Sequence, residues 1–303
     1  MKRAKILNYI LAAVVLVLVV KLTYKEKPVT KLFVNTTESE NTQSMDEEIT
    51  INSTYQARVW LTVAESKRLI AKGLKNYPPI KERLKNGYVL ITKGTTNTYV
   101  AEEFLNDSLT NGEYVLGHIL PANGTAKLDR SKNRKEVIFK NGTVIDTAYA
   151  DILDDMSEGD IVMKGANIIN YQKKQAGVLI GHPTGGTVGA ITPKIEEKKL
   201  RLIIPVGLEK ETSQDIDVLS QITKVPHEAV GGKMPYVWSI KGELFTELEA
   251  IKQFADVEAI HMASGGIGGA EGAVTICIRG SKEEVEKAVA VVKSVQGEKP
   301  FVQ

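Results

Sequence analysis

The chain has 303 residues, of which 43% are hydrophobic and 25% are charged, and its formal net charge at pH 7 is +2. This composition is typical of globular proteins, and the length suffices for two modest domains. The nearly neutral balance gives no overall field that would favour nucleic acid as a partner. A single cysteine, Cys277, excludes a disulfide framework within one chain.

The first 25 residues predict a membrane segment. Lys2, Arg3 and Lys5 precede a continuous, mostly apolar run over 6–20. The pattern resembles a signal peptide, but no small-residue cleavage site follows, and a span of a bilayer needs about 20 residues. We expect residues 1–25 to form an uncleaved single-pass anchor, with a cleaved signal as the alternative. The short positive tail favours an extracytoplasmic folded part, and the cytoplasmic side stays open.

Residues 26–56 predict an acidic, flexible linker, because they are rich in Glu, Asp, Thr, Asn and Ser and show little apolar periodicity. The folded part is expected to begin at Thr62-Val-Ala-Glu65, a capping box that opens a helix ending at Pro78-Pro79.

Strands and helices are expected to alternate over the following 57–230 domain. The predicted strands are 88–92, 114–120, 161–163, 177–180 and 200–205, with a hairpin over 136–145 around Asn141-Gly142. The predicted helices are 99–105, 148–156 and 215–223. This alternation predicts an α/β domain with a doubly wound, mostly parallel sheet.

The C-terminal part, 231–303, has a different order of predicted strands and helices. Its predicted strands are 236–240, 257–263 and 273–279, and its predicted helices lie around 244–251 and after Ser281. The order β-α-β-β-α predicts a ferredoxin-like α+β domain. The glycine-rich stretch 265–272 precedes a strand and not a helix, so we expect a mobile hairpin loop, with a loop that closes over a ligand or partner as the alternative.

Three stretches of small and hydroxyl residues each follow a predicted strand. Glycine lets a backbone approach a ligand, the free N–H groups of a helix start favour an anion, and ligands of such sheets bind beyond the carboxyl ends of the strands. We therefore predict one pocket for a small phosphorylated or carboxylated anion, with plain structural turns as the alternative. The candidate ligand-binding residues are Lys93, Gly94, Thr95, Thr96, Asn97, Thr98, Lys164, Gly165, Asn167, His182, Thr184, Gly185, Gly186 and Thr187.

The sequence indicates no catalytic residue, cofactor or metal. The first loop lacks the G-x-x-x-x-G-K-[ST] pattern of nucleotide hydrolases, and no His–Cys spacing is typical of a metal site. The acidic residues between Asp151 and Asp160 are expected to form a solvated helix end, and Cys277 is expected to be a packing residue.

The pattern from about Glu65 to Gly189 resembles the superfamily of ribose-5-phosphate isomerase, glucosamine-6-phosphate deaminase and the CoA transferases. Gly94–Thr98 is similar to the isomerase's first phosphate loop, Asp160–Asn170 to its aspartate-rich strand and loop, and Gly185-Gly186 to its third, glycine-rich loop. A ferredoxin-like module also accompanies that isomerase. The resemblance implies the fold and an anion pocket.

The departures from that family concern catalysis. Lys164 and Asn167 stand where the isomerases have acidic residues in the second loop, and Thr184 replaces the lysine before the third-loop glycines. Removal of a proton next to a carbonyl needs a positioned base, and the sequence shows none. The resemblance therefore argues against the isomerase reaction itself.

Three functions follow from these patterns as hypotheses. The favoured one is a membrane-tethered, non-catalytic module that binds a small anionic ligand. The second is an enzyme of the same fold with rearranged catalytic groups, acting on a sugar phosphate or an acyl thioester. The third is a structural module that forms homo-oligomers through the ferredoxin-like unit.

Overall fold

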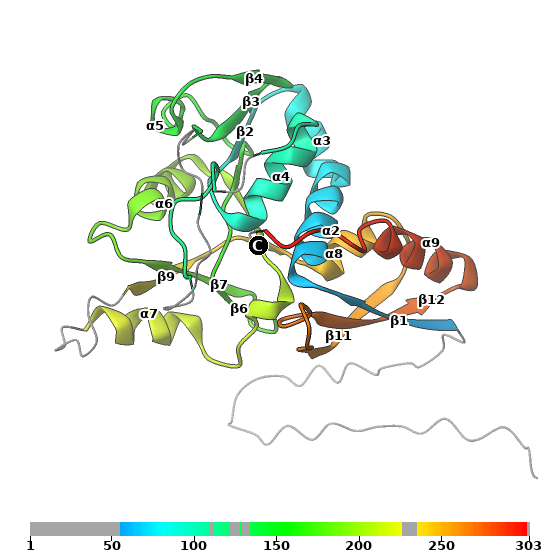
Figure 1. Ribbon diagram of the computed structural model, residues 1–303. Coiled ribbons are helices and arrows are strands. Elements are labelled where there is room, and N and C mark those ends of the chain that lie inside the picture. Colours follow the sequence, from blue (N-terminus) through cyan, green and yellow to red (C-terminus); the bar gives the residue numbers. More distant parts are fainter. Residues whose placement is uncertain (1–54, 110–111, 121–127, 129–133, 226–234, 302–303) are drawn as a thin grey trace, which may run out of the picture. The chain divides into compact units, whose positions relative to one another are not determined.

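The computed structural model describes residues 55–109, 112–120, 128, 134–225 and 235–301. The chain divides into two units, Met1–Asn52 and Ser53–Gln303, and the described residues all belong to the second (Figure 1). The predicted anchor, 1–25, and nearly all of the predicted linker, 26–56, lie outside them. Within the described ranges, no helix is both long and apolar enough to cross a membrane.

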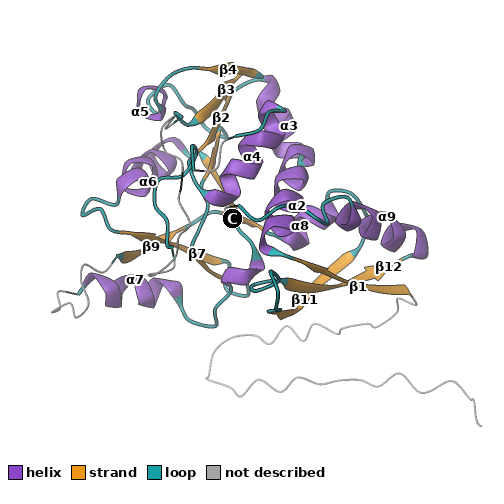
Figure 2. Ribbon diagram, viewed as in Figure 1, coloured by secondary structure: helices purple, strands orange, loops and turns teal. Residues whose placement is uncertain are grey.

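The second unit is a mixed α/β structure with a central six-stranded sheet and two flanking antiparallel sheets (Figure 2). Four strands of the central sheet run parallel, and two more extend it antiparallel at one edge. In spatial order they are β10 (Glu243–Phe245), β8 (Arg201–Pro205), β5 (Ile161–Met163), β2 (Tyr88–Ile91), β3 (Val137–Lys140) and β4 (Thr143–Ile145).

The register of the parallel strands places their carboxyl ends along one edge. Ile91 is the partner of Met163, and Met163 is in turn the partner of Ile203. The strands are almost wholly apolar and buried, as expected for parallel strands covered on both faces. At the other end of the sheet the predicted hairpin is confirmed, since Asn141 and Gly142 turn with φ of 51° and 78°.

The first flanking sheet has the order β1 (Tyr55–Leu61), β12 (Val274–Gly280) and β11 (Glu258–Ser264). Its strand β1 was not predicted, because it begins inside the expected linker. Its buried positions alternate with exposed ones, since Val59 and Leu61 are buried while Trp60 is exposed. The second flanking sheet has the order β6 (Ile168–Asn170), β7 (Gln175–Ile180) and β9 (Tyr236–Ile240).

Nine helical segments connect and cover the sheets in the described part of the chain. They are α2 (Val63–Asn76), α3 (Pro78–Lys85), α4 (Thr95–Leu105), α5 (Tyr149–Ile152), α6 (Gly186–Lys198), the 3-10 turn η1 (Leu208–Lys210), α7 (Ile216–Lys224), α8 (Glu247–Lys252) and α9 (Lys282–Lys293). The capping box predicted at Thr62 is confirmed: its side chain accepts from Glu65 N, and Glu65 accepts from Thr62 N at 2.8 Å.

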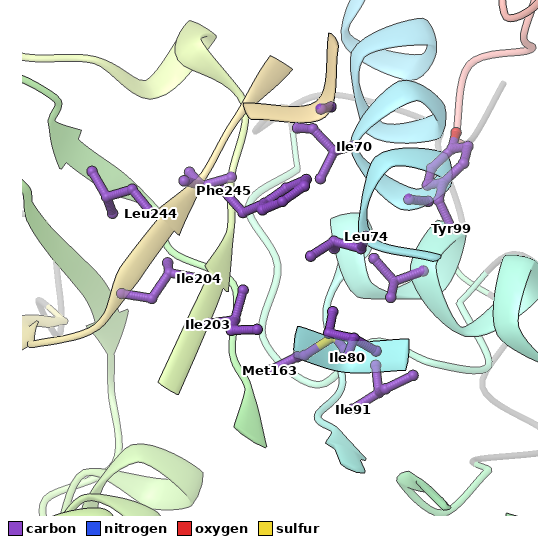
Figure 3. Close-up of a cluster of buried hydrophobic side chains, with 14 of the residues drawn as sticks. Ile70, Leu74, Ile80, Ile91, Tyr99, Met163, Ile203, Ile204, Leu244 and Phe245 are labelled. Atoms are coloured by element: carbon purple, nitrogen blue, oxygen red, sulfur yellow. The ribbon is translucent and has the colours of Figure 1, made fainter. Parts of the chain in front are cut away.

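The hydrophobic core lies between α2 and the central sheet. Figure 3 shows Ile70 and Leu74 of α2 near Phe245, with Met163 and Ile91 on the strands below, and all five side chains are buried. The glycine at position 73 lets α2 approach α8 closely, because a Cβ there would lie 2.7 Å from Ala250 Cα.

Two expectations about the strands are wrong. Residues 114–120 form no strand; instead the buried Tyr114 donates its hydroxyl to Ile91 O and accepts from Val137 N at 2.7 Å. The three strands expected in the C-terminal domain are also divided, since β9 pairs with β7, whereas β11 and β12 pair with each other in another sheet. Propensity and spacing identify a strand, but its partner is decided by long-range packing.

Candidate functional site

The first two predicted loops meet at the carboxyl edge of the central sheet. They follow the parallel neighbours β2 and β5, and Thr92 N donates to Met163 O at 3.0 Å. Asn97 fixes the junction, because its Nδ2 donates to Thr92 O at 2.8 Å and to Met163 O at 3.2 Å. Lys93–Thr98 and Lys164 therefore belong to one neighbourhood, as the strand pattern predicts.

The first loop opens helix α4 without a side-chain cap. Gly94 is the N-cap residue and has no side chain, so the first-turn N–H groups gain no side-chain acceptor. The hydroxyl of Thr98 donates to Gly94 O at 2.9 Å. Asn97 Oδ1 is buried and has no hydrogen-bond partner among the described residues. The positive end of the α4 dipole thus faces the carboxyl edge uncompensated by a side-chain acceptor, which favours an anion there.

Asn167 belongs to the structure of the second loop. Its backbone N donates to Gly177 O at 2.9 Å, and its Oδ1 accepts from Leu179 N at 3.0 Å. Both partners lie in β7, so Asn167 ties the second loop to the neighbouring sheet. Its role as a ligand-binding residue stays a prediction.

The third predicted loop is built on a different sheet. It follows β7, which is antiparallel to both its neighbours, so the expectation that all three loops follow parallel neighbours is wrong for this one. Packing explains two of its glycines: a Cβ at Gly185, where φ is +82°, would lie 2.7 Å from Trp238, and one at Gly189 would lie 1.9 Å from Thr184 O.

The polar residues of this loop interact with each other. His182 Nδ1 lies 3.0 Å from Thr184 Oγ1, and both residues are exposed. Gly186 and Thr187 form the first turn of α6, a helix that also has no side-chain cap. Their part in a shared pocket therefore stays a prediction.

Three lysines converge where the first two loops meet. Lys67 comes from the first turns of α2, Lys164 follows β5, and Lys210 ends η1 after β8. Burial and then the positive charge of Lys210 lower the pKa of Lys67 to about 8, although Glu209 opposes the shift. The same two causes lower the pKa of Lys164 to about 8. Lys210 therefore lies within electrostatic reach of both Lys67 and Lys164.

Two carboxyl groups border the lysines. Glu209 Oε1 lies 3.8 Å from Lys210 Nζ, while Glu209 Oε2 is buried and has no hydrogen-bond partner among the described residues. Its carboxylate folds over Gly207, where a Cβ would lie 1.9 Å from Oε2, so a larger residue at that position would require the Glu209 side chain to move.

Glu247, the first residue of α8, is fully buried. Its carboxylate accepts from Leu208 N at 3.0 and 3.3 Å. Burial, with the charge of Glu209 as the next cause, raises the pKa of Glu247 to about 7. Ser66 Oγ is near enough to favour the ionised form, but it makes no hydrogen bond to any described residue.

Sequence reasoning missed Lys67, Glu209, Lys210 and Glu247. A signal for Glu209 and Lys210 existed, because they come soon after the predicted strand 200–205, and ligands bind beyond the carboxyl ends of such strands. Glu247 follows β10, a three-residue strand that was taken into the helix around 244–251. Lys67 had a signal as well, because it lies three residues before Ile70 and seven before Leu74, on the apolar face of α2, where a lysine interrupts the hydrophobic stripe.

The predicted glycine-rich hairpin loop borders this group. A Cβ at Gly272 would lie 3.0 Å from Val63 and 3.9 Å from Glu209 Cβ. On the strand before the loop, His261 bridges Glu211 Oε2 at 2.8 Å and Ser264 Oγ at 2.9 Å. The hairpin between β11 and β12 thus forms one wall beside Glu209.

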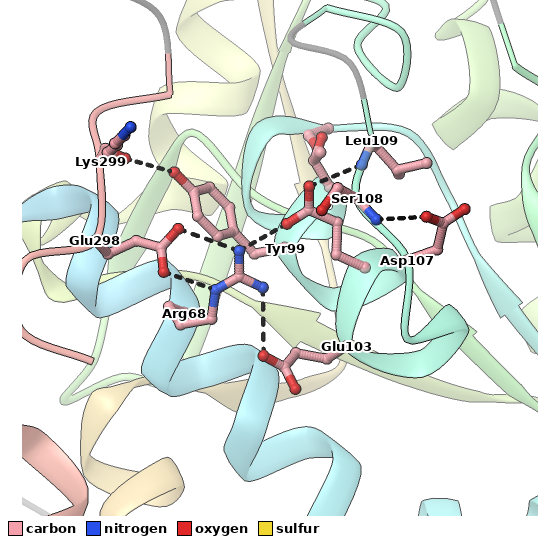
Figure 4. Close-up of polar contacts among 11 residues, drawn as sticks. Arg68, Tyr99, Glu103, Asp107, Ser108, Leu109, Glu298 and Lys299 are labelled. Atoms are coloured by element: carbon pink, nitrogen blue, oxygen red, sulfur yellow. Dashed lines mark hydrogen bonds and ion pairs between the residues drawn. The ribbon is translucent and has the colours of Figure 1, made fainter. Parts of the chain in front are cut away.

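A second polar cluster lies on the outer side of α2. Arg68 contacts Glu102, Glu103 and Glu298, and its guanidinium lies 4.7 Å from the centre of the Tyr99 ring (Figure 4). An open hollow beside it is lined by Arg68, Glu102, Glu103, Asn106, Asp107 and Ser108. Because the arginine is already matched by carboxylates, this cluster fastens the C-terminal segment and offers no unpaired cation.

Comparisons with known proteins add no assignment. No family model matches the sequence, and neither a curated protein nor a solved structure is similar to it. Within the described ranges, no three His, Cys, Asp or Glu side chains are grouped so that they could hold a metal ion. The lysines and carboxylates at the carboxyl edge are therefore the features from which a function is inferred.

Proposed function

We propose that this chain binds a small phosphorylated or carboxylated anion at the carboxyl edge of the central sheet, against Lys67, Lys164 and Lys210. The observation that carries the proposal is the state of the first two lysines. Lys67 is 8% exposed and Lys164 is half-buried, yet neither ammonium has a hydrogen bond or ion pair with any described residue. Burying an unpaired charge is costly, and an anionic ligand would remove that cost.

The uncapped start of α4 supports the same proposal. Its first-turn N–H groups lie at the end of β2, beside the loop that carries Lys164. Backbone donors and ammonium groups together are the usual means of holding phosphate or carboxylate oxygens. Thr95, Thr96 and Asn97 would then hold the anion from the α4 side, and the lysines from the opposite side.

The favoured hypothesis from the sequence is a non-catalytic binding module, and an enzyme acting on a sugar phosphate or acyl thioester is the second candidate. One observation favours the enzyme: Glu209 and Glu247 supply the carboxyl groups that the sequence did not reveal. A buried carboxyl with a raised pKa beside a second carboxylate is typical of acid–base sites. Anion binding is common to both candidates.

The proposal also includes a fold relationship and a membrane tether, both of which the sequence predicts. We propose a doubly wound central domain related to the isomerase, deaminase and CoA-transferase superfamily, and a tether through residues 1–25. The four parallel strands with helical connections support the first part. Support for a ferredoxin-like unit is narrower, because β11 and β12 share a sheet on which α8 and α9 pack, while β9 and β10 pair elsewhere.

Calorimetry on the full chain tests the proposal, with a panel of sugar phosphates, nucleotides and acyl-CoAs. Lys67→Met removes one ammonium, and the expected loss of affinity is about tenfold or more, since a charge-assisted contact is worth roughly 1.5–3 kcal/mol. Lys252→Met removes an exposed lysine on α8 and should leave affinity unchanged. The proposal is wrong if no member of the panel binds, or if the two variants behave alike.

A further inference from the structure

Lys164 occupies a fixed position in the middle of the parallel strands. It follows β5, which lies between β2 and β8, and its backbone N donates to Ile203 O at 3.1 Å. Its side chain is half-buried and its amine has no hydrogen-bond or ion-pair partner in the described part of the chain. A backbone held by the sheet therefore presents an amine to which no other described group is bonded.

Lys210 differs from Lys164 in its contacts. Its Nζ donates to Ala166 O at 3.0 Å and lies 3.8 Å from Glu209 Oε1, so its proton is held in place. Burial and the fixed positive charge of Lys210 both disfavour the protonated form of Lys164. Together they lower the pKa of Lys164 to about 8. Desolvation and a nearby cation are the two means by which proteins turn lysine into a nucleophile.

We propose that Lys164 is a nucleophilic amine that forms an imine with a small anionic aldehyde or ketone. The inference rests on the anion site proposed above and adds the chemical class of its ligand. Lys67 and Lys210 would hold the phosphate or carboxylate group, which brings the carbonyl carbon to Lys164 Nζ.

The reaction balances without an oxidant or reductant. The lone pair of Nζ forms a bond to the carbonyl carbon, and the π pair moves to oxygen, which takes up the proton that nitrogen loses. The resulting hydroxyl accepts another proton and leaves as water while the C=N bond forms. Glu209 lies near Lys210 and Lys67 and is not among the groups that influence Lys164, so solvent water carries these protons.

Lys67 is less suited to this role. The negative charge of Glu209 favours its protonated form, and its Nζ lies 5.9 Å from the centre of the Phe301 ring. No carboxylate opposes the lowered pKa of Lys164. Lys67 is therefore assigned to anion binding, and the variants below distinguish the two lysines.

Reductive trapping on the full chain tests the inference. The protein is incubated at pH 7.5 with pyruvate or dihydroxyacetone phosphate and cyanoborohydride, and the modified lysine is located by peptide mass spectrometry. We expect Lys164 to be modified at least about tenfold more than the exposed Lys252, because far more of its amine is neutral. Lys164→Arg should abolish the adduct at that position, and Lys67→Arg should keep it. Adducts spread over exposed lysines, with Lys164 modified no more than Lys252, would overturn the inference.

Two further arms separate this inference from the anion site. Inorganic sulfate binding is measured on the unmodified chain and on Lys164→Arg, which keeps a positive charge and should bind within a few-fold. Sulfate binding without an adduct overturns the imine and leaves the anion site standing. Modification of Lys164 by the uncharged glycolaldehyde without any sulfate binding overturns the anion site and supports the reactive amine alone.

Discussion

Arg68 and Glu298 form a two-pronged ion pair across 230 residues of sequence: Nε lies 3.0 Å from Oε2, and Nη2 lies 3.2 Å from Oε1. The guanidinium also contacts Glu102 at 2.7 Å. The pair fastens the C-terminal segment against α2 and α4, close to the start of the helix that carries Lys67 (Figure 4). The ends of the second unit are thus held together by partly buried charge.

We predict that Glu298→Gln lowers the free energy of unfolding by about 1–2 kcal/mol, because a two-pronged, charge-assisted contact is lost. Thermal or urea unfolding of the full chain measures the change. The matched control is Glu286→Gln, which removes an exposed partner 3.9 Å from Lys282 and should cost less than about 0.5 kcal/mol. Equal effects of the two substitutions would show that the C-terminal segment is not held by Arg68.

The raised pKa of Glu247 should make the free energy of unfolding depend on pH. Its pKa in the folded chain is raised from 4.5 to about 7, so between these values the folded chain holds more protons than the unfolded chain. Stability should therefore fall as the pH rises from 4.5 to about 7, and this contribution should then level off. In Glu247→Gln the side-chain oxygen can still accept from Leu208 N, but the group no longer titrates. The decrease in stability between pH 4.5 and about 7 should therefore become smaller. Denaturant unfolding across this range is the measurement, with the exposed Glu196→Gln as control. A profile unchanged by the Glu247 substitution would contradict the assignment.

The buried Lys67 should lower the free energy of unfolding while it contributes to anion binding. Its pKa is lowered from 10.5 to about 8, so the unfolded chain binds more protons between these values, and stability should rise with pH there. Below that range the buried charge is a cost, and Lys67→Met should raise the free energy of unfolding at pH 7 by on the order of 2 kcal/mol. The same variant should bind the anion about tenfold more weakly. A variant that is both less stable and fully able to bind would refute this reading of the site.

The unpredicted strand β1 offers a test by truncation. A fragment of 53–303 keeps β1, whereas one of 62–303 exposes the β12 edge that pairs with it from Tyr55 to Leu61. We expect the shorter fragment to be unfolded or aggregated, since an open strand edge is prone to pair with other chains. Circular dichroism and size-exclusion chromatography compare the two fragments. Equal folding of both would mean that β1 is dispensable.

Local signals explain most of what the sequence predicts. Thr62 caps α2 and Asn141-Gly142 turns the hairpin because these residues act on their own neighbourhood. The apolar runs at 161–163 and 201–205 indicate buried strands for the same reason. Tyr114 is different: it is placed by hydrogen bonds to β2 and β3, which no local pattern encodes.

The site is less predictable than the fold because its charged residues come from distant elements. Lys67 and Glu247 lie 180 residues apart in sequence, and both come within reach of Glu209 only when α2 packs on α8. In the sequence, Gly185 suggests a loop that approaches a ligand. In the structure, the close approach of the Trp238 ring already explains why glycine stands there. Glycine alone does not distinguish a ligand from a close side chain.

The anion site is tested most directly by counting the protons that move when an anion binds. At pH 8 about half of the Lys67 and Lys164 amines are neutral, and an anion between them should drive both toward the protonated state. Calorimetric titration with inorganic sulfate in two buffers of different ionisation enthalpy measures this uptake. We predict uptake of up to about one proton per chain at pH 8, reduced by half in Lys67→Met and unchanged in Lys252→Met. Sulfate binding with no proton uptake, or uptake in Lys67→Met as large as in the unmodified chain, would contradict the account.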